Sequence, residues 1–190
     1  MSEKTSDLNS QSDHIETVPE VAIRSETAAD QMAVFDVNAA AFGREKEAQL
    51  VNALRASDAF IPELSLVAEK DGAIVGYILF TKVDFINNRN HRGLAIGPVS
   101  VAPRMQGLGI GAALIKVGIE KARKLGFDSV ILLGHPEYYP RFGFLPASKW
   151  NITTSYNAPN ATFALELKPS ALAHVNGEAR YAKEFALNDC

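Results

Sequence analysis

Three alternating glycines, Gly107, Gly109 and Gly111, have the spacing of a ligand-binding turn. Behind them, apolar residues recur at helical spacing as far as Leu125, so the glycines stand at the start of a predicted helix. A helix start presents unpaired backbone N–H groups and the positive end of the helix dipole. Glycine also lets the backbone approach a ligand, because no β-carbon intervenes. The pattern favours a phosphate or pyrophosphate site over a helix start that binds nothing.

A pair of phenols follows the next apolar run. Residues 129–133 predict a strand that ends before Gly134, and Tyr138 and Tyr139 come shortly afterwards. A phenol within hydrogen-bond reach of a leaving group can protonate it. The alternative for both residues is packing, since aromatic side chains commonly anchor a core.

Two known phosphate loops compete for the glycine-rich turn. A Walker loop would end in Gly-Lys-Ser/Thr, and this turn does not. The dinucleotide fingerprint is formally met by Gly107, Gly109 and Ala112, and Asp128 has about the spacing of a ribose-binding acid. However, Asp128 stands at the beginning of the second strand instead of its end. Residues 102–106 also separate the first strand from the glycines, so a dinucleotide-binding oxidoreductase is the weaker reading.

At these residues the chain resembles the GCN5-related N-acetyltransferase (GNAT) superfamily. The cofactor signature of that superfamily is Arg/Gln-x-x-Gly-x-Gly/Ala, and residues 106–111 read Gln-Gly-Leu-Gly-Ile-Gly. Residues 134–144, GHPEYYPRFGF, are similar to the bacterial group of predicted acetyltransferases typified by YhbS. The resemblance extends from about Ile23 to the C-terminus and is strongest between Leu94 and Phe144.

The resemblance implies that acetyl-CoA, the acyl donor, binds at the glycine-rich turn. The backbone N–H groups of residues 108–112 would hold its pyrophosphate. The strand at residues 99–101 would pair with the pantetheine arm, and a splay at Gly97-Pro98 would open the slot for that arm. The expected cofactor-binding residues are Val99, Ser100, Val101, Gln106, Gly107, Leu108, Gly109, Ile110, Gly111 and Ala112.

The resemblance also gives Tyr139 a catalytic role. A Tyr four residues before the Gly of a Gly-Phe pair often protonates the departing thiolate in the superfamily, and Tyr139 has that spacing to Gly143. The thiol formed from the leaving group has a pKa of about 8.5, and a phenol within hydrogen-bond reach can donate a proton to the thiolate. Packing remains the expected role of Tyr138. The shortened segment before the tyrosines, with Pro136, departs from the commoner pattern of the superfamily.

The implied reaction is transfer of an acetyl group to an amine acceptor, a small molecule or a peptide, by direct attack. The alternative is a non-catalytic acyl-CoA-binding or sensing protein on the same fold. The sequence names no clear base: His135 and Glu137 are candidates, as is a water relay, and either residue could simply be solvated. Arg141 could meet a phosphate or lie on the surface.

The remaining pattern predicts an α+β fold, because strands and helices alternate and strands then finish the chain. Asp71-Gly72 between two apolar runs indicates a β-hairpin. The resemblance implies a mixed, largely antiparallel central sheet with helices on both faces, splayed at the central strands. We expect ordered structure to begin at residues 21–24, strands at 64–69, 73–83, 94–101, 129–133 and 162–167, an edge strand at 179–181, and helices through 32–42, 48–54 and 111–125.

Composition limits the remaining classes. The 190 residues are 47% hydrophobic, which suffices for one core, and residues 19–190 are expected to form a single acyltransferase domain. Residues 1–18 are polar and predict a disordered tail. A net charge of −3 without a basic stripe disfavours nucleic acid as a partner. A homodimer is compatible with the sequence.

Neither a membrane span nor a metal site is expected. No apolar run reaches transmembrane length, and the N-terminus lacks the apolar core of a signal peptide. The single cysteine, Cys190, is the last residue and cannot form an internal disulfide. These features fit a cytoplasmic protein.

Overall fold

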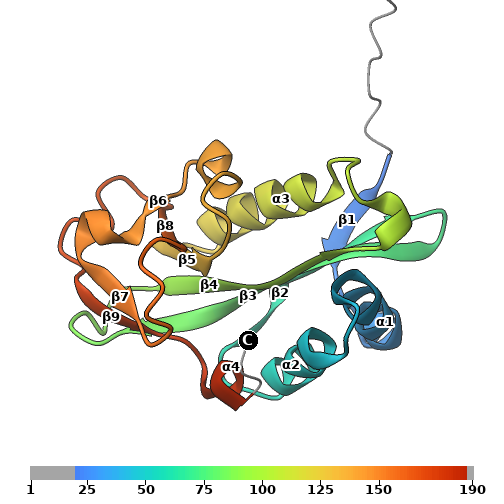
Figure 1. Cartoon of the computed structure of the whole chain (residues 1–190), viewed down its shortest axis with the longest axis horizontal. Coiled ribbons are helices and arrows are strands. Elements are labelled where there is room, and N and C mark those ends of the chain that lie inside the picture. The colour runs from blue at the N-terminus through green and yellow to red at the C-terminus, as the bar shows by residue number, and fades with distance from the viewer. Residues whose placement is uncertain (1–19, 188–190) are drawn as a thin grey trace, which may run out of the picture.

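The computed structural model describes residues 20–187, which form an α+β fold with one central sheet between layers of helices (Figure 1). The strands are β1 (Ala22–Ser25), β2 (Phe60–Lys70), β3 (Ala73–Phe85), β4 (Gly93–Val101), β5 (Ser129–Leu133), β6 (Leu145–Pro146), β7 (Ile152–Thr154), β8 (Thr162–Glu166) and β9 (Gly177–Arg180). The α-helices are α1 (Gln31–Phe42), α2 (Lys46–Arg55), α3 (Ile110–Lys124) and α4 (Lys183–Leu187). Short 3-10 turns are η1 (Ala28–Asp30), η2 (Pro103–Met105), η3 (Tyr139–Phe142) and η4 (Ala147–Trp150).

The sheet is mixed and largely antiparallel, as predicted. Its main path runs β1-β2-β3-β4-β5-β8-β6, and within that path only β4 and β5 are parallel. The hairpin between β2 and β3 turns at Asp71 and Gly72, both with positive φ, which confirms the turn signal in the sequence. The edge strand expected at residues 179–181 is present as β9, but its position was wrong. It lies between β3 and β7, because β3 extends far enough to pair with it.

The central strands splay apart where the sequence predicts it. The pairing of β4 with β5 ends at Ala95 and Ile131, whereas β4 continues to Val101. On its other side β4 bulges, since residues 97–98 stand opposite Leu79 alone in the register with β3. Proline has no N–H to give to a ladder, so Pro98 suits this interruption. One edge of β4 is therefore left open beyond Ala95.

Both faces of the sheet are covered by helices. Along β3, Ile78 and Phe80 face the layer of α3, while Tyr77 and Leu79 face the layer of α1 and α2. This alternation follows from the two-residue period of a strand. Helix α3 lies close to the sheet because Gly118 has no side chain: a β-carbon there would stand 2.2 Å from the Phe80 ring.

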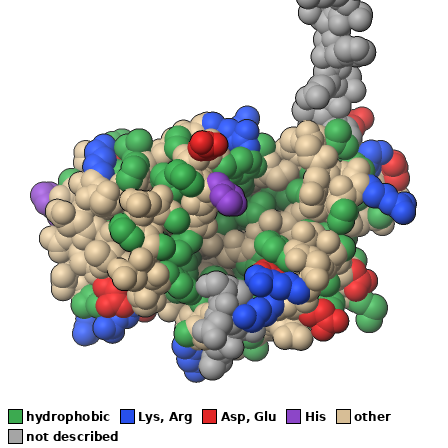
Figure 2. Space-filling model, viewed as in Figure 1, with side chains coloured by type: hydrophobic (Ala, Val, Ile, Leu, Met, Phe, Trp, Pro, Cys, Tyr) green, Lys and Arg blue, Asp and Glu red, His purple; other side chains and the backbone are tan. Residues whose placement is uncertain are grey.

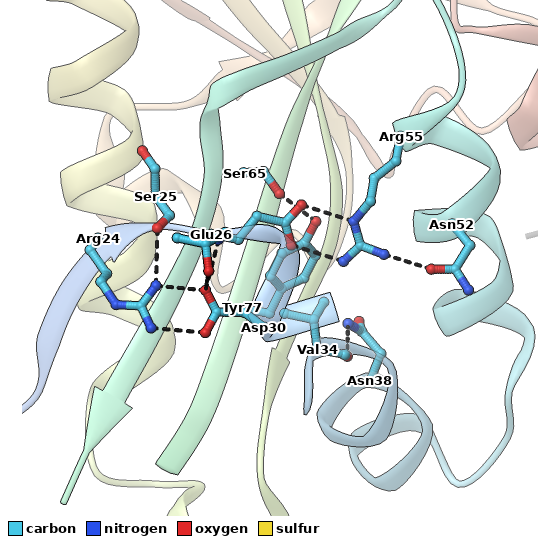
Figure 3. A network of polar contacts seen from close by, with 11 residues as sticks. Arg24, Ser25, Glu26, Asp30, Val34, Asn38, Asn52, Arg55, Ser65 and Tyr77 are labelled. Carbon is cyan, nitrogen blue, oxygen red and sulfur yellow. Dashed lines mark hydrogen bonds and ion pairs between the residues drawn. The ribbon is translucent and has the colours of Figure 1, made fainter. Parts of the chain in front are cut away.

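A buried polar network anchors α2 to the end of β1 (Figure 3). The Arg55 guanidinium donates two hydrogen bonds of 2.8 Å to the two carboxylate oxygens of Glu26, and a third of 2.6 Å to Asn52 Oδ1. The side chains of Arg55 and Glu26 are only 10% and 6% exposed. Beside them, the hydroxyls of Ser65 and Tyr77 are 2.7 Å apart. The network fixes the helix whose first turn borders the candidate site.

Several expectations fall outside or beside this description. The tail expected at residues 1–18 and the terminal Cys190 lie outside residues 20–187. Within the described part of the chain, no helix is both long and apolar enough to cross a membrane. In the same residues, no three His, Cys, Asp or Glu side chains gather as metal ligands would.

Candidate active site

The glycine-rich turn folds as a tight connection between β4 and α3. Gly107 and Gly109 both have a φ of 79°, a backbone region in which a β-carbon is costly. Gly109 is the N-cap of α3, so it offers no side chain to cap the first N–H groups of the helix. The Gln106 side chain donates to the carbonyl oxygen of Val101 at 3.0 Å and so fastens the turn to the end of β4. The helix-start geometry predicted from the glycine spacing is present.

A cavity of about 350 Å³ opens at this helix start. It brings together Val101 and six of the seven residues predicted between 106 and 112. Leu108 does not line it, and its side chain is 41% exposed. The lining residues are Val101, Met105, Gln106, Gly107, Gly109, Ile110, Gly111, Ala112, Tyr138 and Arg141.

Arg141 supplies the positive charge of this cavity. Its guanidinium carbon lies 3.7 Å from the centroid of the Tyr138 ring, a stacked cation–π arrangement that holds the side chain in place. The Tyr138 hydroxyl is close to the helix start as well, 3.7 Å from where a β-carbon of Gly111 would lie. Tyr138 therefore packs, as expected, and also borders the helix start. Arg141 is exposed at the surface and also borders this cavity, so both readings of this residue stay open.

The open edge of β4 begins beside this cavity, at Val101, and continues to Val99. The N–H of Ala102 donates to Val75 on β3 at 2.9 Å, so the backbone groups of Val101 and Val99 point to the opposite side. The carbonyl of Val101 is engaged by Gln106, whereas the backbone of Val99 faces the gap left by β5. Ser100 differs from its neighbours: its backbone faces β3, where it pairs with Tyr77, and its side chain is buried, so neither faces the open edge of β4.

A second cavity, of about 410 Å³, lies where β4 and β5 diverge. Figure 2 shows the molecule hollowed on this face, with hydrophobic side chains gathered around the opening. Val99 lines this cavity and Val101 lines the first, so the two cavities follow one another along the edge of β4. The lining residues are Phe42, Glu47, Leu50, Ile96, Gly97, Pro98, Val99, Leu133, Gly134, His135, Tyr139, Tyr156, Tyr181 and Phe185.

Tyr139 lies in the second cavity, opposite the open edge of β4. Its ring packs against the backbone of Gly134: a β-carbon at that glycine would be 2.0 Å from Cε2 of the ring. Burial, and to a lesser extent the neighbouring Tyr138, raises the pKa of the Tyr139 hydroxyl above its ordinary value. The hydroxyl thus keeps its proton at neutral pH, as a general acid must.

The two predicted base candidates separate in the structure. Both side chains are exposed, but only His135 borders the second cavity. A carboxylate that the sequence reasoning missed, Glu47, also borders the cavity and is buried. Burial opposes its ionisation, but the hydrogen bonds from Arg44, a backbone hydrogen bond and the charges of Arg44 and Lys46 together lower its pKa. Glu47 is therefore a paired anion and a poor base.

A signal for Glu47 was present in the sequence. Together with Leu50, Val51 and Leu54 it occupies the buried stripe of α2, at positions i, i+3, i+4 and i+7. An acid on an apolar stripe needs a partner or a function. No comparable local signal marked Tyr156, Tyr181 or Phe185, because β7, β9 and α4 bring them to the cavity only through tertiary structure.

The dinucleotide reading fails on position. Asp128 immediately precedes β5, and its carboxylate accepts hydrogen bonds from Lys168 at 2.5 Å and from the Arg92 backbone at 2.8 Å. Because β4 and β5 are parallel and begin side by side, the beginning of β5 and the end of β4 lie at opposite ends of the two strands. An acid at Asp128 cannot reach a ligand on the glycine-rich turn.

Comparison with known families agrees with this geometry. The family model for the Acetyltransferase (GNAT) family matches residues 32–144, which contain the glycine-rich turn and Tyr139. The chain belongs to the GNAT family. The matched span also includes α2, β4, β5 and nearly all of α1, so the GNAT relationship covers most of the site.

Two relatives from Escherichia coli show the same relationship in sequence. The uncharacterized N-acetyltransferase YjhQ of Escherichia coli is 42% identical over 120 residues, which are 63% of this chain and 66% of YjhQ. The uncharacterized N-acetyltransferase YhbS of E. coli is 31% identical over 146 residues, 76% of this chain and 86% of YhbS.

Two solved structures share the fold. YhbS from E. coli in complex with CoA has a TM-score of 0.83 at 27% identity and covers 87% of this chain and 92% of its own. A GNAT family acetyltransferase from Brucella melitensis in complex with acetyl-CoA has a TM-score of 0.72 at 34% identity, covering 87% and 98%.

Proposed function

We propose that this chain is an acetyl-CoA-dependent N-acetyltransferase that transfers the acetyl group to an amine by direct attack. One observation carries the proposal: a glycine-rich helix start with its own cavity and a tyrosine-bearing cavity follow one another along the open edge of β4. A molecule with a diphosphate at one end and a thioester at the other fits such an arrangement. The CoA and acetyl-CoA in the two related structures support this donor.

The donor would lie along β4 from the first cavity to the second. The backbone N–H groups of residues 108–112 would bind the pyrophosphate, with the helix dipole and the Arg141 guanidinium opposing its charge. The pantetheine arm would pair with the open edge of β4 at residues 99–101, where Val99 directs its backbone groups to the gap. The acetyl group would then reach the second cavity beside Val99, whose N–H is directed to the gap.

Transfer needs three events in the second cavity. The neutral amine attacks the thioester carbonyl, and the N–H of Val99 would stabilise the oxygen that becomes negative. The carbon–sulfur bond then breaks, and the Tyr139 hydroxyl would protonate the departing thiolate. The proton lost by the amine would pass to water or to His135, which borders the cavity. We further propose that residues 19–190 act as one acyltransferase unit.

Ligand-dependent stability tests the donor. Acetyl-CoA at 100 times its dissociation constant should raise the unfolding free energy by about 2.7 kcal/mol. NAD at the same concentration should change the unfolding free energy far less, because Asp128 lies at the end of the strands opposite the glycine-rich turn. Thermal denaturation with each ligand gives the result. Stabilisation by NAD with no effect of acetyl-CoA would refute the proposal.

Gly109→Val tests the location of the donor. The valine must adopt a φ near 79° and adds a branched side chain to the first cavity, so acetyl-CoA affinity should fall by at least about tenfold. Gly72→Val is the matched control, since Gly72 has a φ of 78° in the β2–β3 hairpin, remote from both cavities. Calorimetric titration of both variants measures the affinity. Equal affinities in the two variants would move the donor elsewhere.

A further inference from the structure

We infer that the amine acceptor is a small primary amine with an aromatic body and a single positive charge. The inference rests on the proposed function and concerns the second cavity, where Val99 and Tyr139 place the transfer. A volume of about 410 Å³ lies within the usual range of sites for small molecules. The cavity also has to hold the acetyl end of the donor, which leaves space of roughly single-ring size for the acceptor.

The outer wall of the cavity is aromatic. The rings of Tyr156 and Tyr181 meet edge to face at 5.4 Å, and those of Tyr181 and Phe185 do the same at 5.3 Å. Phe42, at the end of α1, adds a ring that is 40% exposed. Aromatic rings prefer such offset and edge-on neighbours, so an aromatic ligand would find complementary contacts on this wall.

The charges around the cavity exclude an acceptor with several positive charges. Glu47 is the carboxylate that borders it, and two hydrogen bonds of 3.1 Å from Arg44 Nε already engage that carboxylate. Among residues 20–187, the other ionisable groups that line the cavity are His135 and the phenols Tyr139, Tyr156 and Tyr181, none of which is an anion at neutral pH. A second ammonium group of a polyamine would therefore be desolvated without a partner.

The apolar cavity also explains how the amine becomes a nucleophile. Removing an ammonium group from water disfavours its charged form and lowers its pKa. A primary amine that enters between aromatic side chains therefore loses its proton more readily than in solution. This reduces the demand for a dedicated base, which agrees with the pairing of Glu47 and the exposure of Glu137.

An acceptor comparison tests the inference. Free thiol release from acetyl-CoA would be followed with 2-phenylethylamine, with spermidine and with a short lysine-containing peptide. We expect kcat/KM for 2-phenylethylamine to exceed the other two values by at least about tenfold. A better rate with spermidine or the peptide overturns the acceptor inference and leaves the proposed function standing. Stabilisation by acetyl-CoA with no transfer to any of the amines also overturns it. Failure of acetyl-CoA to bind would instead refute the donor.

Phe42→Ser tests whether recognition of the aromatic amine takes place in the second cavity. We expect it to raise KM for 2-phenylethylamine about tenfold and to leave acetyl-CoA affinity unchanged, because Phe42 lies away from the helix start. Met32→Ser is the matched control: Met32 is on the same helix, 78% exposed, and outside the cavity. Equal KM values for the two variants would contradict the inference.

Discussion

Replacing Tyr139 by Phe should lower turnover by about 10²–10⁴-fold, the usual contribution of a general acid. The substitution keeps the ring that packs on Gly134 and removes only the hydroxyl. Acetyl-CoA affinity should change little, because the proposed phosphate site, at the helix start and Arg141, lies in the other cavity. Steady-state kinetics with a saturating amine and calorimetric titration of the donor separate the two effects.

Tyr138→Phe is the matched control for this prediction. Tyr138 precedes Tyr139 in the chain but lines the first cavity, where its ring supports Arg141. Loss of its hydroxyl should leave turnover nearly unchanged. Full turnover in Tyr139→Phe, or an equal loss in both variants, would remove the general-acid role and leave Tyr139 as a packing residue.

The role of Gly134 follows from the same geometry. A β-carbon there would overlap the Tyr139 ring, so Gly134→Ala must displace the phenol and should lower turnover while leaving donor affinity intact. If Gly134 acts only by orienting the hydroxyl, adding Gly134→Ala to Tyr139→Phe should cost little more. Additive losses in the double variant would show that the glycine serves another purpose.

Arg55→Met should lower the unfolding free energy by about 3–5 kcal/mol, the usual cost of breaking a buried ion pair. The Glu26 carboxylate would remain buried, at 6% exposure, without the guanidinium that now donates two hydrogen bonds to it. Urea denaturation measures the change. The double variant Glu26→Gln/Arg55→Met should recover much of the loss, because no unpaired charge remains.

An exposed ion pair provides the comparison. Lys70→Met breaks the pair between Lys70 and Asp71 in the hairpin turn, where Asp71 is 85% exposed, and should cost less than about 1 kcal/mol. If Arg55→Met proved no more costly than Lys70→Met, the network would not be the anchor of α2. Because Glu47 and Leu50 of α2 border the second cavity, the same anchor also supports the proposed acceptor site.

Local patterns were sufficient for most of the fold. The strand at residues 129–133 was predicted to the residue, and the helix through residues 111–125 and the Asp71-Gly72 hairpin turn were also present, because each depends on periodicity and turn residues that neighbours in sequence supply. The splay at residues 97–98 was predictable from Pro98 and from the resemblance to the GNAT superfamily. The position of β9 was not, since pairing with β3 depends on residues far away in the chain.

The two halves of the site differed in the same way. Most of the proposed anion-binding half comes from residues 101–112, which the glycine spacing marks in the sequence, and Tyr138 and Arg141 complete it. The proposed acceptor half combines Phe42 and Glu47 with Tyr156, Tyr181 and Phe185 from the last quarter of the chain. The separation of Tyr138 and Tyr139 into different cavities depends on the turn of η3, which no periodic pattern encodes.

The most direct test is the product balance of acetyl-CoA incubated with the protein and a mixture of primary amines. Mass spectrometry would quantify N-acetylated amine, and a thiol reagent would quantify free CoA. We predict equal amounts of the two products, both strongly reduced in Tyr139→Phe. Acetyl-CoA that binds but stays intact with every amine would make the chain a non-catalytic binder. Free thiol without an acetylated amine would also contradict N-acetyl transfer.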